Sequence, residues 1–165
     1  MSSCKQLLTA LALTAVAGTA AAAFPERELS GVIMWGAGGA TDVVARALNP
    51  HAEAVLGKKV VLVNRAGGTG AISTNFVMNA PADGYTILYG AENPQLHQVL
   101  SLADFGYEKF TPVTILGRGV AVVVVKADAP YNSLKEFVED AKKKPGKLKM
   151  GSTGPGGLPH TVGSM

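Results

Sequence analysis

Hydrophobic and polar positions follow two different spacings along this chain. Short apolar runs rich in β-branched residues predict strands, and longer amphipathic segments between them predict helices. The predicted strands are Gly31–Trp35, Val60–Asn64, Tyr85–Tyr89, Val113–Leu116, Val120–Lys126 and Leu148–Ser152. Strands that alternate with helices in this way predict an α/β fold with a parallel sheet.

Helices are predicted in most of the gaps between these strands. They begin at Asp42, after Gly70, at Asn93-Pro94 and at Ser133, and a further helix is expected after the loop that ends at Gly157. Asn93 is a good cap with proline at the first helical position. Ser133 and Glu136 have the spacing of a capping box, in which each side chain satisfies a main-chain amide of the first turn.

Four of the predicted strands end in loops that could face a ligand. These loops are Gly36–Ala40, Arg65–Gly70, Gly90–Asn93 and Ser152–Pro159. Ligands of open α/β sheets bind beyond the carboxyl ends of the strands, so the loops are expected to surround one crevice. A tight turn explains any single loop, but four in succession favour a site. The first loop gathers main-chain N–H groups at a helix start, which predicts an anion-binding site.

Residues 1–23 have the order of an export signal. Lys5 gives a positive start, Leu7–Val16 form an apolar core, and small residues up to Ala23 suit cleavage. A membrane anchor is the alternative, but this core is much shorter than the roughly 20 residues needed to cross a bilayer. Cys4 precedes the core, whereas a lipid-attachment cysteine follows it. We therefore predict an exported protein cleaved near Ala23.

Charge and composition exclude several classes of function. The chain has 165 residues with 15 Lys and Arg against 12 Asp and Glu, and this weak, scattered excess does not indicate nucleic-acid binding. Its single cysteine lies in the leader, so the exported part has no disulfide and no thiolate metal site. His51, His97 and His160 lack the spacing of metal ligands, and surface or helix-end positions are expected for them.

The glycine loops do not match the common nucleotide motifs. A P-loop requires lysine after its last glycine, but Gly39 is followed by alanine. In the dinucleotide motif G-x-G-x-x-G, Gly36 and Gly38 fit, while Thr41 replaces the third glycine. Arg65 after the second strand could hold the 2′-phosphate of NADP, so an exported reductase remains an alternative. No G-x-S-x-G elbow is present, and no catalytic residue, metal or cofactor is predicted.

Six segments resemble, in order, the signature of the solute receptors of tripartite tricarboxylate transporters, the TctC or Bug family. They are Met34–Arg46, Val63–Gly70, Ala82–Thr86, Phe110–Val113, Lys144–Leu148 and Ser152–Gly157. The resemblance implies a periplasmic binding protein of type II, with two lobes that contain doubly wound sheets and close on a ligand.

The same resemblance implies a division of the chain. Residues 24–117 correspond to the first lobe without its C-terminal return, and residues 118–165 to the start of the second, with the crossover near Arg118. Family members are twice as long, so the sequence resembles a fragment or the product of an interrupted gene. A remnant that binds nothing is therefore a further alternative.

The resemblance also implies a ligand and its partners. Family receptors hold small carboxylates through main-chain N–H groups and bound water, and they deliver the solute to integral membrane permease subunits. A monomeric receptor without catalytic activity is expected. Carried over by position, the ligand-binding residues are Trp35, Gly36, Ala37, Gly38, Gly39, Thr41, Asp42, Ala91, Glu92, Asn93, Ser152, Thr153, Gly154 and Gly156.

Two of these positions bear on ligand choice. The family often has Pro-Phe where this chain has Met34-Trp35, so loop rigidity and ligand preference are expected to differ. The Glu92 carboxylate accepts hydrogen bonds but cannot donate them, and it therefore favours a ligand with an amino or hydroxyl group and opposes a second carboxylate. An exposed loop acid without a role is the alternative.

Overall fold

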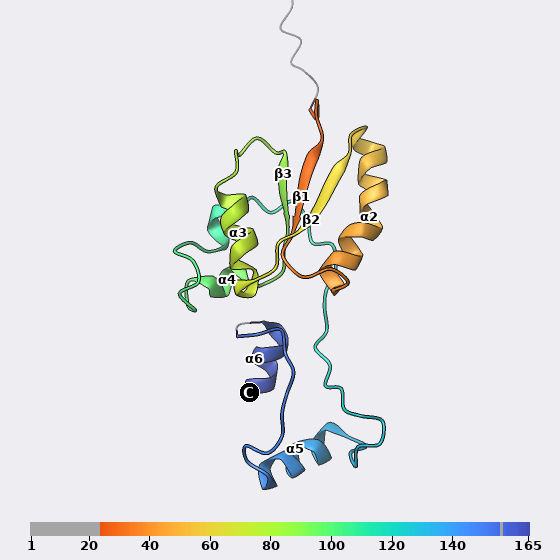
Figure 1. Ribbon diagram of the computed structural model, residues 1–165, viewed down its shortest axis with the longest axis vertical. Coiled ribbons are helices and arrows are strands. Elements are labelled where there is room, and N and C mark those ends of the chain that lie inside the picture. Colours follow the sequence, from red (N-terminus) through yellow and green to blue (C-terminus); the bar gives the residue numbers. More distant parts are fainter. Residues whose placement is uncertain (1–23, 156) are drawn as a thin grey trace, which may run out of the picture.

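The computed structural model describes residues 24–155 and 157–165 (Figure 1). Within these ranges the strands are β1 (Leu29–Ile33), β2 (Val60–Asn64) and β3 (Thr86–Tyr89). The helices are α2 (Ala40–Leu56), α3 (Ala71–Met78), α4 (Pro94–His97), α5 (Leu134–Lys143) and α6 (Leu158–Ser164), with short 3₁₀ turns η1 (Gly68–Gly70) and η2 (Tyr107–Lys109). The predicted α/β class is confirmed.

The strands form one parallel sheet in the order β2-β1-β3. Ile33 at the end of β1 lies opposite Asn64 of β2 and Tyr89 of β3, so the three carboxyl ends share one edge. Right-handed crossovers to either side of a central strand place their helices on opposite faces of a sheet. Figure 1 shows α2 and α3 on the two sides of the sheet accordingly.

The hydrophobic core surrounds the central strand β1. Its buried apolar residues are Leu29, Val32, Ile33, Met34, Ala45, Val60, Ala71 and Phe105. The neighbours close tightly over Gly31, where an added Cβ would lie 2.5 Å from Leu62 Cδ2 and 2.9 Å from Tyr89 Cε2. Burial on both faces explains why apolar side chains occupy the adjacent positions Val32 and Ile33 without alternation.

Two predicted boundaries move in ways that shape the site. β1 ends at Ile33 and not at Trp35, and its ladder closes with the Met34 amide donating to the Tyr89 carbonyl at 3.1 Å. α2 begins at Ala40, because extended Gly39 caps it and its carbonyl accepts from the Val43 amide at 3.0 Å. Asp42 therefore lies inside the first turn and not at its start.

The strands predicted at 113–116, 120–126 and 148–152 do not form, so that prediction is wrong. Residues 113–126 run without regular structure, and Val113, Val120 and Val124 are 86%, 84% and 81% exposed. A strand needs a neighbour for its main-chain N–H and C=O groups, and these segments lie beside no strand of the described chain. Apolar composition alone does not supply that partner.

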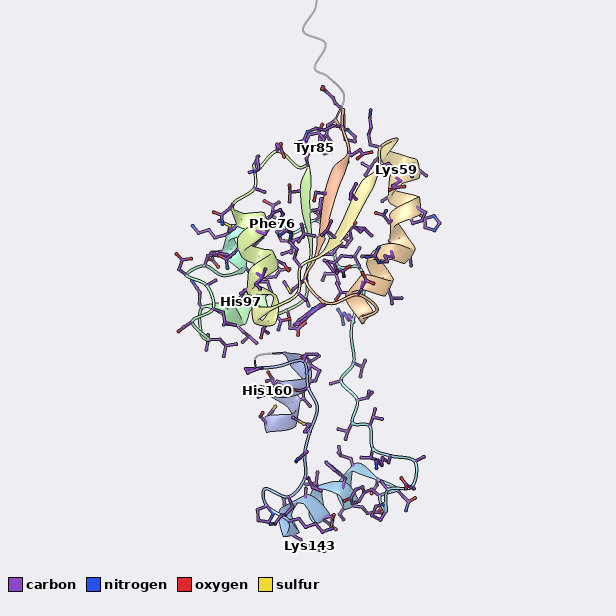
Figure 2. The ribbon with its side chains drawn as sticks, viewed as in Figure 1. Lys59, Phe76, Tyr85, His97, Lys143 and His160 are labelled. Carbon is purple, nitrogen blue, oxygen red and sulfur yellow. The ribbon has the colours of Figure 1, made fainter. Side chains whose placement is uncertain are left out.

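The helix predicted at Ser133 is confirmed as α5. The Glu136 amide donates to Ser133 Oγ at 3.2 Å, and the Glu136 carboxylate accepts from the Asn132 amide at 2.8 Å. In Figure 2, Lys143 at the end of α5 lies far from the sheet. None of the helices in the described ranges is long and apolar enough to cross a membrane. α6 follows the last glycine loop, as predicted.

Candidate functional site

The loop between β1 and α2 presents main-chain donors at the carboxyl end of the sheet. Gly36 and Gly38 are exposed, and Gly38 has a φ of +80°, a conformation that favours glycine. The Gly39 amide donates to the Gly36 carbonyl at 3.3 Å, whereas the amides of Gly36 and Ala37 have no acceptor among the described residues. The first three amides of α2 are also left without an intrahelical acceptor. These donors suit an anion.

The Asp42 side chain is buried and turns toward the chain itself. Its Oδ2 accepts from the Gly38 amide at 2.9 Å, and its Oδ1 accepts from Arg46 Nε and Asn64 Nδ2, both at 2.9 Å. Hydrogen bonds from Gly38 and Asn64, with the Arg46 guanidinium beside them, hold the pKa of Asp42 below its ordinary value although burial opposes this. Asp42 is thus a carboxylate that organises the loop.

Asn64 extends this network to the neighbouring strand. Its Nδ2 also donates to the Trp35 carbonyl at 2.9 Å, and its Oδ1 accepts from Arg46 Nη2 at 2.8 Å. One amide side chain at the end of β2 therefore fixes both the entry of the loop, at Trp35, and the carboxylate that holds Gly38. The loop shape is set by residues outside the loop.

Met34 forms the floor beneath the loops. Its side chain is fully buried, and it packs against Gly70 after β2 and Gly90 after β3. A Cβ on Gly90 would approach Met34 Cε to 3.3 Å, and a Cβ on Gly70 would overlap the Met34 sulfur. The glycines that follow two different strands therefore make room for the same methionine, which brings their loops together.

The second loop is held against α3. Arg65 lies with its guanidinium carbon 3.8 Å from the centre of the Phe76 ring, and its carbonyl accepts from the Ser73 hydroxyl. Thr69 adopts a left-handed conformation with φ of +52°, which is rare for a β-branched residue. The Thr69 hydroxyl donates to the Pro155 carbonyl at 2.6 Å. This contact brings the fourth predicted loop to the second.

The remaining predicted residues differ in accessibility. In the third loop, Glu92 is exposed and Ala91 is half-buried, while the Asn93 side chain is fully buried and so turned into the protein. In the fourth loop Ser152 and Thr153 are exposed, and the Ser152 hydroxyl accepts from the Gly154 amide at 3.4 Å. Gly156 lies outside the described residues. The first three loops share one edge of the sheet, and Thr69 connects the fourth.

Other parts of the described chain contain histidines and a cavity. Among the described residues no group of three His, Cys, Asp or Glu side chains is arranged to hold a metal. His97 is fully buried and is the last residue of α4, so of the two positions expected for it the helix end is confirmed and the surface is wrong. A cavity of about 270 Å³ is lined by Arg46, Asn49 and Pro50 of α2 and by Leu62 of β2.

Sequence reasoning missed the residues that support the site. The sequence placed Asn64 only at the end of a predicted strand, because its partner Asp42 lies 22 positions earlier and no local pattern joins the two residues. Thr69 was treated as part of a glycine turn. The available signal was a hydroxyl residue between two glycines in a loop already expected at the site.

A three-stranded parallel sheet with its loops gathered at the carboxyl edge and main-chain donors turned outward defines an α/β binding fold. The family model described as "Tripartite tricarboxylate transporter family receptor", TctC, matches residues 44–163. The chain belongs to this family, which confirms the resemblance.

Relatives and solved structures agree with this assignment. A protein of Pseudomonas sp. strain P51, called "UPF0065 protein in tcbD-tcbE intergenic region", is 32% identical over 87% of this chain and 43% of its own length. Protein BugT of Bordetella pertussis is 32% identical over 84% of this chain and 44% of its own length. The chain thus spans about half the length of the relatives it matches.

Two solved structures share the fold. One, titled "Structure of a periplasmic transporter", has a TM-score of 0.69 and 32% identity, and covers 86% of this chain and 48% of its own. The other, "R. palustris Rpa4515 with adipate", has a TM-score of 0.58 and 28% identity, and covers 76% of this chain and 43% of its own. The first is named as a periplasmic transporter and the second as a protein with adipate, and both structures agree with the family assignment.

Proposed function

We propose that this chain binds a small carboxylate at the loop after β1 and serves as the receptor of a tripartite transporter, without catalysis. The observation that carries the proposal is the set of amides without main-chain acceptors in the described chain, at Gly36, Ala37 and the first turn of α2, beside the Asp42 carboxylate, whose charge is already compensated within the chain. Because Asp42 is satisfied by Gly38, Asn64 and Arg46, its charge is compensated before a ligand carboxylate arrives. Backbone donors and bridging water suffice for such a ligand.

The binding set has two roles in this proposal. Trp35, Gly36, Ala37, Gly39 and Thr41 surround the ligand together with Ala91, Glu92, Ser152, Thr153, Gly154 and Gly156. Gly38, Asp42 and Asn93 support the loops, because the Gly38 amide is already donated to Asp42 and the other two side chains are buried. The lobe division near residue 118, export with cleavage near Ala23, the monomeric state and delivery to permease subunits belong to the same proposal.

The reductase alternative has less support. Arg65, the residue expected at a 2′-phosphate, stacks over Phe76, and the adjacent Asn64 side chain donates to Asp42 and to the Trp35 carbonyl. Neither side chain is turned to a cofactor, so NADPH serves as the contrasting ligand in the test.

Titration of the full-length protein tests the proposal through its single tryptophan. Trp35 is half-buried beside the proposed amides, so adipate or citrate should change its fluorescence saturably, whereas NADPH should produce no saturable binding change. A saturable response to NADPH alone would favour the reductase. Absence of any response from folded protein would count against carboxylate binding at this loop.

Substitution of Glu92 should change ligand preference. Glu92→Gln removes a negative charge from the third loop and should strengthen binding of adipate, which has two carboxylates, by about threefold to tenfold, since like charges weaken association. Glu139→Gln, an exposed acid on α5, is the matched control and should bind like the parent. Calorimetric titration of both variants measures the ratio, and equal affinities would remove Glu92 from the specificity residues.

A further inference from the structure

Thr69 connects two parts of the chain that are far apart in sequence. Its hydroxyl donates to the Pro155 carbonyl at 2.6 Å across 86 positions, from η1 of the sheet unit (residues 24–112) to the loop that precedes α6. Between these positions the chain runs away from the sheet through α5 and returns, so that α6 lies near the carboxyl edge (Figure 1). The contact therefore fixes where the returning loop meets the sheet unit.

The backbone at Thr69 is held in an unfavourable conformation. Its φ of +52° and ψ of +37° are left-handed values that β-branched residues rarely adopt. Strain of this kind persists only where the surroundings impose it, and it is concentrated at binding and switch segments. A glycine at this position would adopt the same conformation without strain. The residue present between two glycines is nevertheless one with a hydroxyl group.

The buried His97 side chain contacts the main chain of Thr69. Its imidazole is fully buried, with Nε2 2.9 Å from the Thr69 carbonyl oxygen and Nδ1 3.4 Å from the Thr74 hydroxyl. A carbonyl can only accept, so Nε2 donates to the Thr69 carbonyl. The Thr74 hydroxyl near Nδ1 also lies within hydrogen-bond distance of the Gly70 and Ala71 carbonyls, at 3.2 and 3.1 Å. α4 thus holds the main chain of Thr69 while its side chain stays available. Figure 2 shows His97 at the end of the sheet unit nearest α6.

The contact borders a space between the two parts. Leu96, Val99 and Leu100 line one side of a cavity of about 300 Å³, and Pro155, His160 and Met165 contribute to the other side. Pro155 thus belongs both to the wall of this cavity and to the Thr69 hydrogen bond. Loss of that bond would let the fourth loop move relative to the sheet unit.

We propose that Thr69 is a positioning residue for the fourth binding loop, with its main chain held by His97 and its hydroxyl holding residues 152–155 over the carboxyl edge of the sheet. The consequence for ligand affinity rests on the proposed function, because residues 152–154 contact the solute in that account. The contact itself is independent of any ligand.

Amide hydrogen exchange of the full chain without ligand tests the contact. Thr69→Val keeps the β-branched shape and removes the hydroxyl, and should speed exchange of the α6 amides about tenfold, while Thr69→Ser should match the parent. Exchange in β1 should be the same in all three proteins, which separates loss of the contact from general unfolding. Equal α6 exchange in the Val and Ser variants, or equal acceleration in β1, would overturn the proposal.

Adipate binding supplies the second readout. The affinity for adipate should fall in Thr69→Val and be retained in Thr69→Ser. If α6 exchange differs between the two variants while their adipate affinities are equal, Thr69 has only a structural role and its proposed part in binding is overturned. If the parent protein binds neither adipate nor citrate, the proposed function fails, while the exchange comparison still decides whether Thr69 holds the loop.

Discussion

Replacement of Gly70 by alanine should lower the free energy of unfolding by about 3 kcal/mol. Gly70 has a φ of +89°, where an L side chain is strained, and an added Cβ would overlap the Met34 sulfur and lie 2.5 Å from Met34 Cγ. Met34 is fully buried beneath three loops, so it has little room to move. Overpacking and backbone strain therefore act together at one residue.

Urea unfolding followed by Trp35 fluorescence measures this effect. Gly119→Ala is the matched control, because nothing lies within 4 Å of its Cβ position, and its stability should remain within about 0.5 kcal/mol of the parent. An unchanged unfolding midpoint in Gly70→Ala would mean that Met34 does not fix the second loop, and the shared floor of the site would have to be abandoned.

Replacement of Asp42 by asparagine should loosen the first loop and weaken adipate binding by at least about tenfold. Both carboxylate oxygens accept hydrogen bonds, Oδ2 from Gly38 and Oδ1 from Arg46 and Asn64. The asparagine side chain has one oxygen that accepts and one NH2 group that only donates. That NH2 group must face an N–H donor, either the Gly38 amide or the side chains of Arg46 and Asn64. The fluorescence of Trp35, whose carbonyl is bound by Asn64, should report the change.

Acidification should reproduce this effect in the parent protein. The folded-state pKa of Asp42 lies below its ordinary value, so its stabilisation of the loop is present above about pH 4 and is lost as the pH falls through the folded-state pKa. The Trp35 signal should show this acid transition in the parent and not in Asp42→Asn. Asp128→Asn, which changes an exposed acid, should retain both the transition and parental adipate affinity. An acid transition and an adipate affinity equal to those of the parent in Asp42→Asn would refute the role given to this carboxylate.

Local patterns predicted the parts of the fold whose causes are local. Val60–Asn64 was placed with its observed bounds, and Ser133 caps α5, since strand propensity and capping depend on near neighbours. The strand predicted at Val120–Lys126 failed because strand formation depends on a partner from elsewhere, and no such partner lies beside it in the described chain.

The candidate site also has features with local causes, which the sequence predicted, and features that depend on distant residues, which it did not. The glycine loop after β1 was found from its own residues, because backbone freedom and a helix start are visible in a short window. The Asp42–Asn64 bond and the His97–Thr69 bond join residues 22 and 28 positions apart, so only the folded chain brings them together. The sequence thus predicted a ligand site at this loop, which stays a prediction, and did not indicate the side chains that hold the loops.

Main-chain amide signals of the full-length protein, followed by NMR during adipate titration, test the central claim most directly. The account predicts saturable shifts centred on the amides of Gly36, Ala37 and the first turn of α2, with little change at Gly119. Saturable binding with its shifts centred on another surface, such as the cavity beside Arg46 and Pro50, would contradict it, as would no binding by folded protein.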